Sequence, residues 1–334
     1  MAARRSVIPI EHPRLRGYTP LDLVTGGYFA ITAIILAVRH DRIPHGTHYL
    51  LLHIAILAAI ALLGFIPRRG HVLLMFLRDS YTLWALPLLY KEVGILNRLV
   101  WPRFFDSIVL GWEHGLFGVF PSLFLRSWLP NRLLDEFLHF SYLTYYGLVP
   151  ILGFWLYLRG REELCRVFAT TVMVTFFSCY LMFIFFPVAG PYYVFVQDKI
   201  GSGIFPPIVH RVLASGASRG AAFPSSHVAG AVAVLWMAAR FERPLVPLLG
   251  TLCAGIFFGT VYGGFHYGVD ALAGLGVGVL CSLAGPGIHS WLLRRARLGP
   301  LRFRFPHLFD PLVTALWGIR RRPDKGASRS RTAL

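Results

Sequence analysis

Long apolar runs alternate along the chain with short segments that carry most of its charges. A helix that crosses a bilayer needs about 20 mostly apolar residues, and the pattern meets or approaches that length about eight times. The predicted spans are 21–38, 48–66, 79–97, 137–158, 164–187, 227–241, 245–263 and 267–284. Of these, 79–97 is interrupted by charged residues and 227–241 is short. The pattern therefore predicts an all-α fold, a polytopic transmembrane helical bundle with about eight membrane segments.

Two stretches lack the spanning pattern. The segment 98–136 mixes aromatic and leucine-rich patches with acids and arginines, which predicts helices lying in the outer membrane interface. The tail 291–334 is basic and amphipathic, which predicts a segment on the inner leaflet. We accordingly expect an N-terminal part with two extra transmembrane helices (1–78), a main transmembrane core (79–290) and a cytoplasmic tail (291–334).

Composition supports a membrane protein. The 334 residues are 55% hydrophobic and only 15% charged, and the mean hydropathy is +0.58, which is too apolar for a soluble domain of this length. The formal net charge of +17 would suggest a nucleic-acid partner in a soluble protein. Here cytoplasmic loops account for it, so we expect no nucleic acid. Arginine far outnumbers lysine, as in a GC-rich genome, and we expect a bacterial plasma membrane.

The arginines also predict the orientation of the bundle. If the N-terminus is cytoplasmic, the main basic clusters fall on the same side, as the positive-inside rule expects. These clusters contain Arg4, Arg5, Arg14, Arg16, Arg68, Arg69, Arg78, Arg159, Arg161, Arg166, Arg240, Arg243, Arg294, Arg295 and Arg297. His227 and His266 then lie on the outer, periplasmic or extracellular, face.

The start of the span at 227 has the chemistry of a helix N-terminus. Pro224 precedes two serines, and Ser225 or Ser226 can cap the helix that His227 enters. The first turn therefore presents free backbone N–H groups and the positive end of the helix dipole. Such a turn is an anion site, and phosphate is its usual ligand.

A second histidine stands near a carboxylate. His266 and Asp270 are four residues apart, so on a helix they would share a face, and the carboxylate could accept the imidazole Nδ1–H. Nε2 would then be free to act as a nucleophile. A lone pair of this kind can equally satisfy only itself. Its predicted position on the same face as His227 favours joint action on one phosphoryl group.

These residues resemble a known family. The sequence Pro224, Ser225, Ser226, His227 resembles the second signature of the type 2 phosphatidic acid phosphatase superfamily, and 266–270 resembles its third. The resemblance covers about 164–284 and implies a six-helix core. It also implies that His266 forms a phosphohistidine, that Asp270 orients it, and that His227 protonates the leaving oxygen. It implies no metal and no other cofactor.

The departures from that family point to a branch. The chain has no Lys-x6-Arg-Pro signature, and Gly259 and Thr260 stand where the phosphatases have Ser-Arg. Those missing cations neutralise a phosphomonoester dianion, so their absence favours a phosphodiester. The same departures occur in the inositol phosphorylceramide synthase and sphingomyelin synthase type, which 260–262 and 186–193 also resemble. This resemblance implies transfer of a phospho-head group from a phospholipid donor to a lipid hydroxyl acceptor.

The remaining candidates are substrate contacts. We expect Ser225, Ser226, Arg219 and Tyr267 to bind the substrate. Arg219 and Arg211 are the nearest candidates to replace the missing cations, although a surface arginine facing head groups fits each of them as well.

Other polar residues carry weaker signals. Glu113 and His114 fit an interfacial contact better than an acid/base pair. His53, His139 and His210 lack a paired carboxylate or ligand at helical spacing and receive no role. The four cysteines are scattered and are expected to be free thiols. The glycines of 273–278 lie inside a span and indicate close helix packing.

Two other functions remain open at this point. A lipid or polyprenyl phosphate or pyrophosphate phosphatase would use the same residues with water as acceptor. A lipid-binding protein or transporter would use the histidines and the aspartate only to hold a head group, but the inverted repeats typical of transporters are missing from the sequence.

Overall fold

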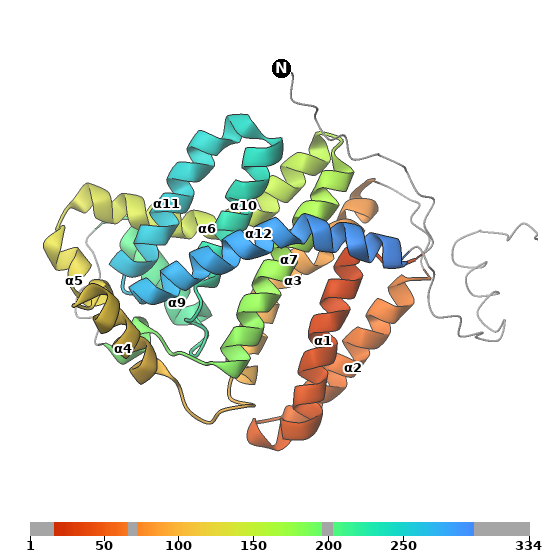
Figure 1. The fold of residues 1–334 in the computed structure, drawn as a ribbon, viewed down its shortest axis with the longest axis horizontal. Helices are drawn as coiled ribbons and strands as arrows, with labels where there is room; N and C mark the ends of the chain where they lie inside the picture. Colours follow the sequence, from red (N-terminus) through yellow and green to blue (C-terminus); the bar gives the residue numbers. More distant parts are fainter. Residues whose placement is uncertain (1–16, 66–71, 196–202, 297–334) are drawn as a thin grey trace, which may run out of the picture. The chain divides into compact units, whose positions relative to one another are not determined.

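The computed structural model describes residues 17–65, 72–195 and 203–296, all within the first of two units, Met1–Leu298 and Gly299–Leu334. These residues form helices and no strand beyond an isolated parallel bridge between Val188 and Ala221 (Figure 1). The helices are α1 (Pro20–Arg39), η1 (His40–Arg42), α2 (Gly46–Leu63), α3 (Val72–Leu96), α4 (Asp106–Phe117), α5 (Pro121–Trp128), α6 (Arg132–Leu158), α7 (Glu162–Phe185), α8 (Pro191–Val194), α9 (Phe205–Gly216), α10 (Ser226–Phe241), η2 (Arg243–Leu245), α11 (Val246–Tyr262) and α12 (Gly268–Ala296). The tail that the sequence predicts beyond residue 296 lies outside the described residues.

Five helices of the described part are long and apolar enough to cross a membrane: Pro20–Arg42, Gly46–Leu63, Glu162–Phe185, Arg243–Tyr262 and Gly268–Arg295. α4 and α5, in the segment predicted to lie in the interface, together pass the same test as one span bent by 48°. The other three predicted spans also form helices, but α10 has only 16 residues and α3 and α6 do not pass. These apolar helices fit an integral membrane protein, while the count of eight spans and the six-helix core stay predictions.

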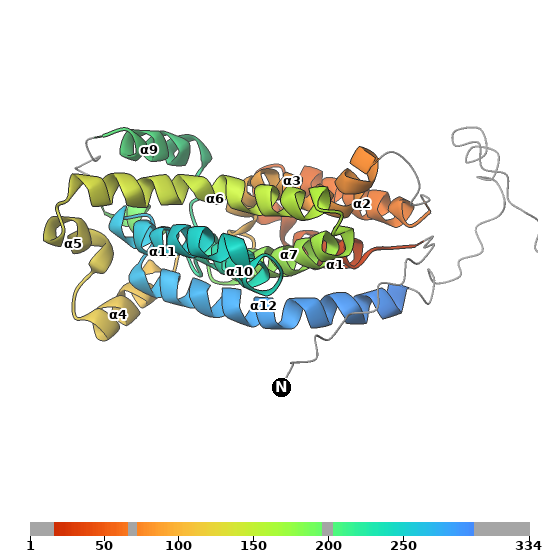
Figure 2. The same ribbon diagram turned by 90° about the horizontal axis from the view of Figure 1, so that it is seen from above.

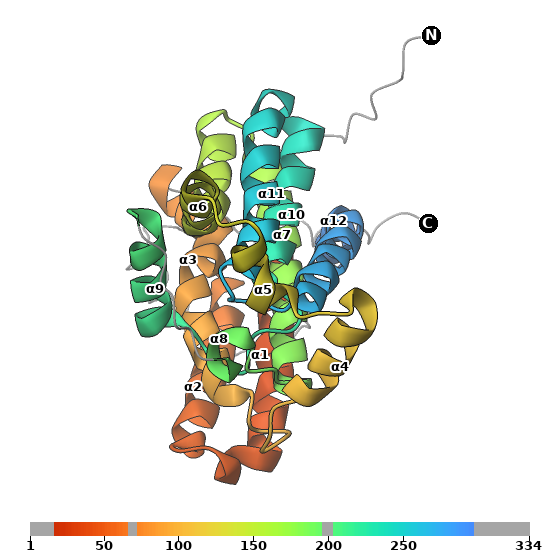
Figure 3. The ribbon, with the colours of Figure 1, turned by 90° about the vertical axis from the view of Figure 1, so that its left-hand side faces the viewer.

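α7 is the central helix of the bundle. It packs against α1, α3, α6, α10 and α12, and Figures 2 and 3 show it surrounded by other helices. Its aromatic residues Phe168, Phe176 and Phe183 are at most 1% exposed. Ile34 and Leu280, on outer helices, are 66% and 68% exposed, as expected for side chains that face lipid.

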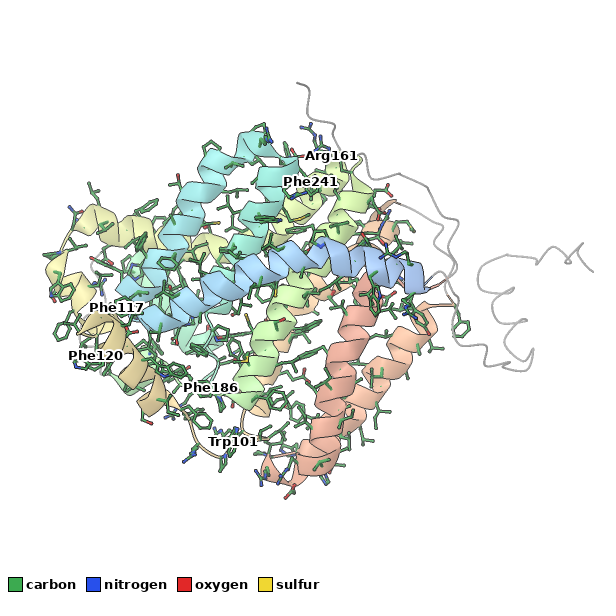
Figure 4. The ribbon with its side chains drawn as sticks, viewed as in Figure 1. Trp101, Phe117, Phe120, Arg161, Phe186 and Phe241 are labelled. Atoms are coloured by element: carbon green, nitrogen blue, oxygen red, sulfur yellow. The ribbon has the colours of Figure 1, made fainter. Side chains whose placement is uncertain are left out.

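Ion pairs join the helices at one end of the bundle. Arg78 on α3 donates twice to the buried Asp22 of α1, at 2.8 and 2.6 Å. Arg166 of α7 donates to Asp79 of α3 at 2.9 Å, and Arg161 donates to Glu242 after α10. Figure 4 shows Arg161 and Phe241 at the end of the bundle away from Trp101 and Phe186. Three arginines of the predicted inner clusters are thus used to tie helix ends together.

At the other end, short elements connect α7 to α10. Val188 N donates to Gly220 O at 3.3 Å, and Ala222 N donates to Val188 O at 3.0 Å, so the chain after α7 lies along the chain before α10. The amphipathic α9 packs on α6. Its start is held by Glu136, whose carboxylate accepts from Ile204 N and Phe205 N at 2.7 and 2.9 Å. These two hydrogen bonds lower the pKa of Glu136.

Candidate active site

The first turn of α10 places His227. Ser225 is the N-cap, and its side chain accepts from Val228 N at 3.4 Å, as the sequence predicts. The N–H of Ser225 donates to Asp270 O at 2.9 Å. The N–H groups of Ser226 and His227 have no hydrogen-bond acceptor among the described residues. The start of α10 is therefore fixed to the start of α12 and keeps two donors available for an anion.

His266 lies in the turn between α11 and α12. α12 begins at Gly268, so the expectation that His266 and Asp270 share a helical face is wrong. Gly264 takes a φ of +69° in this turn, and His266 N donates back to Thr260 O at 2.9 Å. The Asp270 carboxylate caps its own helix by accepting from Tyr267 N at 2.8 Å. The same oxygen lies 3.5 Å from His266 Nδ1.

The two histidines and the aspartate come together in a buried place. The ring centroids of His227 and His266 are 5.6 Å apart, with an angle of 62° between the rings. The residues are 6%, 5% and 0% exposed for His227, His266 and Asp270. Because Asp270 faces Nδ1 of His266, Nε2 is the nitrogen left for chemistry.

Sequence reasoning missed Tyr142 of α6. Its hydroxyl oxygen is 3.1 Å from His227 Nε2, and the two rings stack with centroids 4.9 Å apart. The centroid of the Tyr145 ring lies 4.3 Å from the centroid of the same imidazole ring. His227 Nδ1 is buried and has no partner among the residues that the structure describes. Tyrosines within a predicted span were the available signal, since a hydroxyl at membrane depth needs a partner.

Glu113 has a different position from the one expected. Its side chain is fully buried, and its carboxylate accepts from Gly268 N and Val269 N, both at 2.9 Å. It therefore caps the N-terminus of α12, where a negative charge also complements the helix dipole. His114 is exposed and lies beside Phe120. The interfacial contact expected of Glu113 is therefore wrong, because its carboxylate is buried against the start of α12.

Asp106, at the start of the same helix α4, holds the neighbouring loop. Its carboxylate accepts from Ala189 N and Gly190 N, both at 2.9 Å, and from the Tyr267 hydroxyl at 3.1 Å. The Tyr267 side chain is fully buried. The predicted substrate contact Tyr267 thus lies next to His266 with its hydroxyl already engaged. Asp106 and Glu113 are seven residues apart and share a helical face, which is the sequence signal that could have revealed this clamp.

A cavity of about 490 Å³ opens next to His227. The cavity lies between α3, α6, α7, α9 and α10. Its lining includes Leu213 of α9 and Ala217, which follows α9. Ser226 and His227 also line it. The aromatic part of the lining consists of Trp84, Tyr90, Tyr142, Tyr145, Tyr146, Phe176 and Tyr180. This volume is typical of a small-molecule site, and the predominantly apolar lining suits a hydrocarbon chain.

The predicted arginine contacts lie apart from the histidines. The guanidinium of the exposed Arg219 is 5.0 Å from the centroid of the Phe104 ring and 5.8 Å from that of Tyr193. Arg211 is exposed on α9. In the described part of the chain, neither side chain has a recorded contact with His227 or His266. Their roles in substrate binding stay predictions.

Two histidines that received no role do have carboxylate partners. His139 Nδ1 is 2.9 Å from Asp135 Oδ1, four residues earlier, and His53 Nδ1 is 3.7 Å from Glu92. The expectation of no paired carboxylate at helical spacing is therefore wrong for His139, while the partner of His53 lies on another helix, α3. No group of three or more His, Cys, Asp or Glu residues within the described ranges could hold a metal ion. The four cysteines are free, as expected.

Comparison with known families matches residues 107–284 to the PAP2 superfamily. The matched part runs from α4 into α12 and contains Tyr142, His227, His266 and Asp270. No curated protein and no solved structure matches the chain. Of the glycines in 273–278, Gly274 and Gly278 pack closely as expected, because a Cβ there would meet Ser225 O or Ala229 O, whereas a Cβ on Gly276 would meet nothing within 4 Å. Because the match covers more than half of the chain, the chain belongs to the PAP2 superfamily.

Proposed function

We infer that the chain carries out phosphatase or phosphotransferase chemistry, which its membership of the PAP2 superfamily suggests. We propose that the protein is a membrane lipid phosphotransferase of the inositol phosphorylceramide synthase and sphingomyelin synthase type. It moves a phospho-head group from a phospholipid donor to a lipid hydroxyl acceptor, for which a ceramide-like lipid is the proposed class. The observation that carries this proposal is the buried pair His227 and His266, with a large apolar cavity on the His227 side.

In the first step, His266 Nε2 attacks the phosphorus of the donor, and the bond from phosphorus to the lipid oxygen breaks. A proton from His227 passes to the leaving alkoxide, which departs as a lipid alcohol. Asp270, 3.5 Å from Nδ1 of His266, stabilises the imidazole as it gains positive charge. The intermediate is a phosphohistidine that carries the head group.

In the second step, the acceptor hydroxyl gives its proton to His227, and its oxygen attacks phosphorus. The bond between phosphorus and His266 then breaks, which restores both histidines. The Tyr142 hydroxyl at 3.1 Å from Nε2 fixes the ring of His227 for both proton transfers. Because His227 and Tyr142 line the apolar cavity, a lipid alcohol can present its hydroxyl there.

The charge on phosphorus is held by backbone donors in this proposal. The free N–H groups of Ser226 and His227 point from the first turn of α10, and Ser225 keeps that turn in place. The guanidinium of Arg219 is engaged by two aromatic rings. A singly charged phosphodiester needs less cationic compensation than a monoester dianion, which supports a phosphodiester donor.

We also propose that this site faces the periplasm or the extracellular space, in a bacterial plasma membrane. Support comes from the basic residues at the opposite end of the bundle. Arg78, Arg161 and Arg166 belong to clusters that the positive-inside rule assigns to the cytoplasm.

The experiment that tests the function supplies purified protein with a phospholipid labelled at its head-group phosphorus and with a lipid alcohol. Transfer predicts label in a new lipid whose amount depends on the alcohol, and none with His266→Ala. Release of the labelled phospho-head group into water, at a rate independent of the alcohol, would make the protein a hydrolase. Release of inorganic phosphate from a lipid phosphomonoester or pyrophosphate without any alcohol would favour the phosphatase. Binding of the donor without any turnover would favour a lipid-binding protein.

A further inference from the structure

A second hollow, of about 510 Å³, lies apart from the histidines. Three arginines line it: Arg39 at the end of α1, Arg42 in η1 and Arg98 after α3. The rest of its lining is Val100, Trp101 and Pro102. Figure 4 shows Trp101 beside the turn that joins α1 to α2. The hollow thus lies where the first helical hairpin meets the segment after α3.

The three guanidinium groups form no ion pair with a side chain of the described residues, and the exposed Asp41 is the acidic residue of the turn that carries Arg42. No carboxylate of the described residues lies within ion-pair distance of Arg39, Arg42 or Arg98. Arg42 Nη1 donates to Val100 O at 3.0 Å, which orients the side chain without neutralising it. Arg98 lies 6.0 Å from the centre of the Phe104 ring. Several unpaired guanidinium groups around one hollow favour an anion, and phosphate oxygens suit their forked donors.

The surroundings indicate a ligand from the membrane. Trp101 is 42% exposed, and tryptophans concentrate at the depth of lipid head groups. Val100 and Pro102 add apolar surface against which a glycerol backbone can pack. The positive-inside rule accounts for arginines such as Arg161 at the far end of the bundle and leaves these three unexplained.

We infer that this hollow binds the phosphate-bearing head group of an anionic phospholipid. The site is separate from the proposed catalytic residues, and its existence does not depend on the proposed reaction. Arg39 and Arg42 come from the α1–α2 hairpin, and Arg98 follows α3, so a bound head group bridges the hairpin to the rest of the bundle. A ligand that binds only the folded protein stabilises it.

The test measures the thermal unfolding midpoint of the purified full chain in detergent, titrated with phosphatidylglycerol, phosphatidylcholine or inorganic phosphate. For the unchanged protein, phosphatidylglycerol is expected to raise the midpoint most. The triple variant Arg39→Gln, Arg42→Gln, Arg98→Gln is expected to lose the extra rise that phosphatidylglycerol gives over phosphatidylcholine. The variant Arg159→Gln, Arg240→Gln, Arg243→Gln removes the same charge from exposed positions elsewhere and is expected to keep it.

His227→Ala is expected to keep the rise as well, which separates this site from the catalytic one. Native mass spectrometry of bound phosphatidylglycerol gives a second readout that does not depend on stability. Arg39→Gln alone serves if the triple variant does not fold, because the Arg39 side chain makes no recorded hydrogen bond within the described residues. An unchanged rise and unchanged lipid binding in the arginine variants would overturn the inference. An equal rise with inorganic phosphate would overturn the assignment to a lipid.

Discussion

The backbone N–H of Ser225 donates to the carbonyl oxygen of Asp270 at 2.9 Å, which joins the first turns of α10 and α12. His227 follows the donor, and His266 precedes the helix that carries the acceptor. The separation of the two imidazoles therefore depends on how closely these helix starts approach each other. Gly274 lies at this contact, one turn after Asp270, where a Cβ would meet Ser225 O.

Gly274→Ala is expected to push the two helix starts apart and to lower turnover by tenfold or more, since overpacking of this kind costs about 1–3 kcal/mol. Gly276→Ala is the matched control, because a Cβ there meets nothing within 4 Å. Both changes bring the same gain in helix propensity. Turnover and thermal midpoints of the two variants provide the measurement, and equal turnover would show that the contact is not needed.

Tyr142→Phe keeps the ring that stacks on His227 and removes the hydroxyl at 3.1 Å from Nε2. We expect turnover to fall about tenfold, because a hydrogen bond to a group that becomes charged contributes about 1.5–3 kcal/mol. The KM for the donor is expected to change little, and the pH profile of turnover to shift. Tyr18→Phe removes a hydroxyl that donates to Ala61 O and serves as control. A Tyr142→Phe enzyme with unchanged turnover and pH profile would refute the positioning role.

Glu113→Ala leaves the N–H groups of Gly268 and Val269 without their buried acceptor. Each unsatisfied buried group costs about 1–3 kcal/mol, so the variant is expected to unfold at a lower temperature and to lose activity together with stability. Glu113→Gln retains one acceptor oxygen, so its unfolding temperature is expected to lie between those of the unchanged protein and Glu113→Ala. Unfolding midpoints that do not differ among the three proteins would contradict the capping role.

The carboxylate of Glu136 predicts how the stability of the protein depends on pH. Its pKa is lowered by hydrogen bonds from Phe205 N and Ile204 N. Its stabilising contribution is therefore fully present above the ordinary value of 4.5 and is lost as the pH falls through the lowered pKa. We expect the difference in thermal midpoint between the unchanged protein and Glu136→Gln to shrink on acidification. A difference that stays constant across that range would contradict the role of the carboxylate at the start of α9.

The sequence predicts the residues of the candidate site better than their contacts. Spacing and helix-start chemistry single out His227, His266 and Asp270, and helix order predicts that they meet. The sequence does not predict that Asp270 caps its own helix, because the exact start of α12 depends on the turn at Gly264. The sequence does not predict the roles of Glu113 and Tyr142, because their partners lie far away in sequence. Only the packing of α4 and α6 brings these side chains close to their partners.

The apolar pattern predicts the fold in the same uneven way. Each predicted span coincides with a helix, because long apolar runs leave the backbone no other way to satisfy its hydrogen bonds in lipid. Which helices cross the membrane is harder to predict, since α3 and α6 carry polar residues that are paired inside the bundle. Arg78 with Asp22 is one such pair.

The central claim is that the phosphoryl group passes through His266. Its most direct test is rapid quenching of the purified protein after mixing with a phospholipid labelled at phosphorus. The proposal predicts label attached to the protein that survives base and is lost in acid. It also predicts that His266→Ala carries no label and has no turnover, while His227→Ala keeps its fold. Turnover near that of the unchanged protein in His266→Ala, or label that persists there, would contradict the claim.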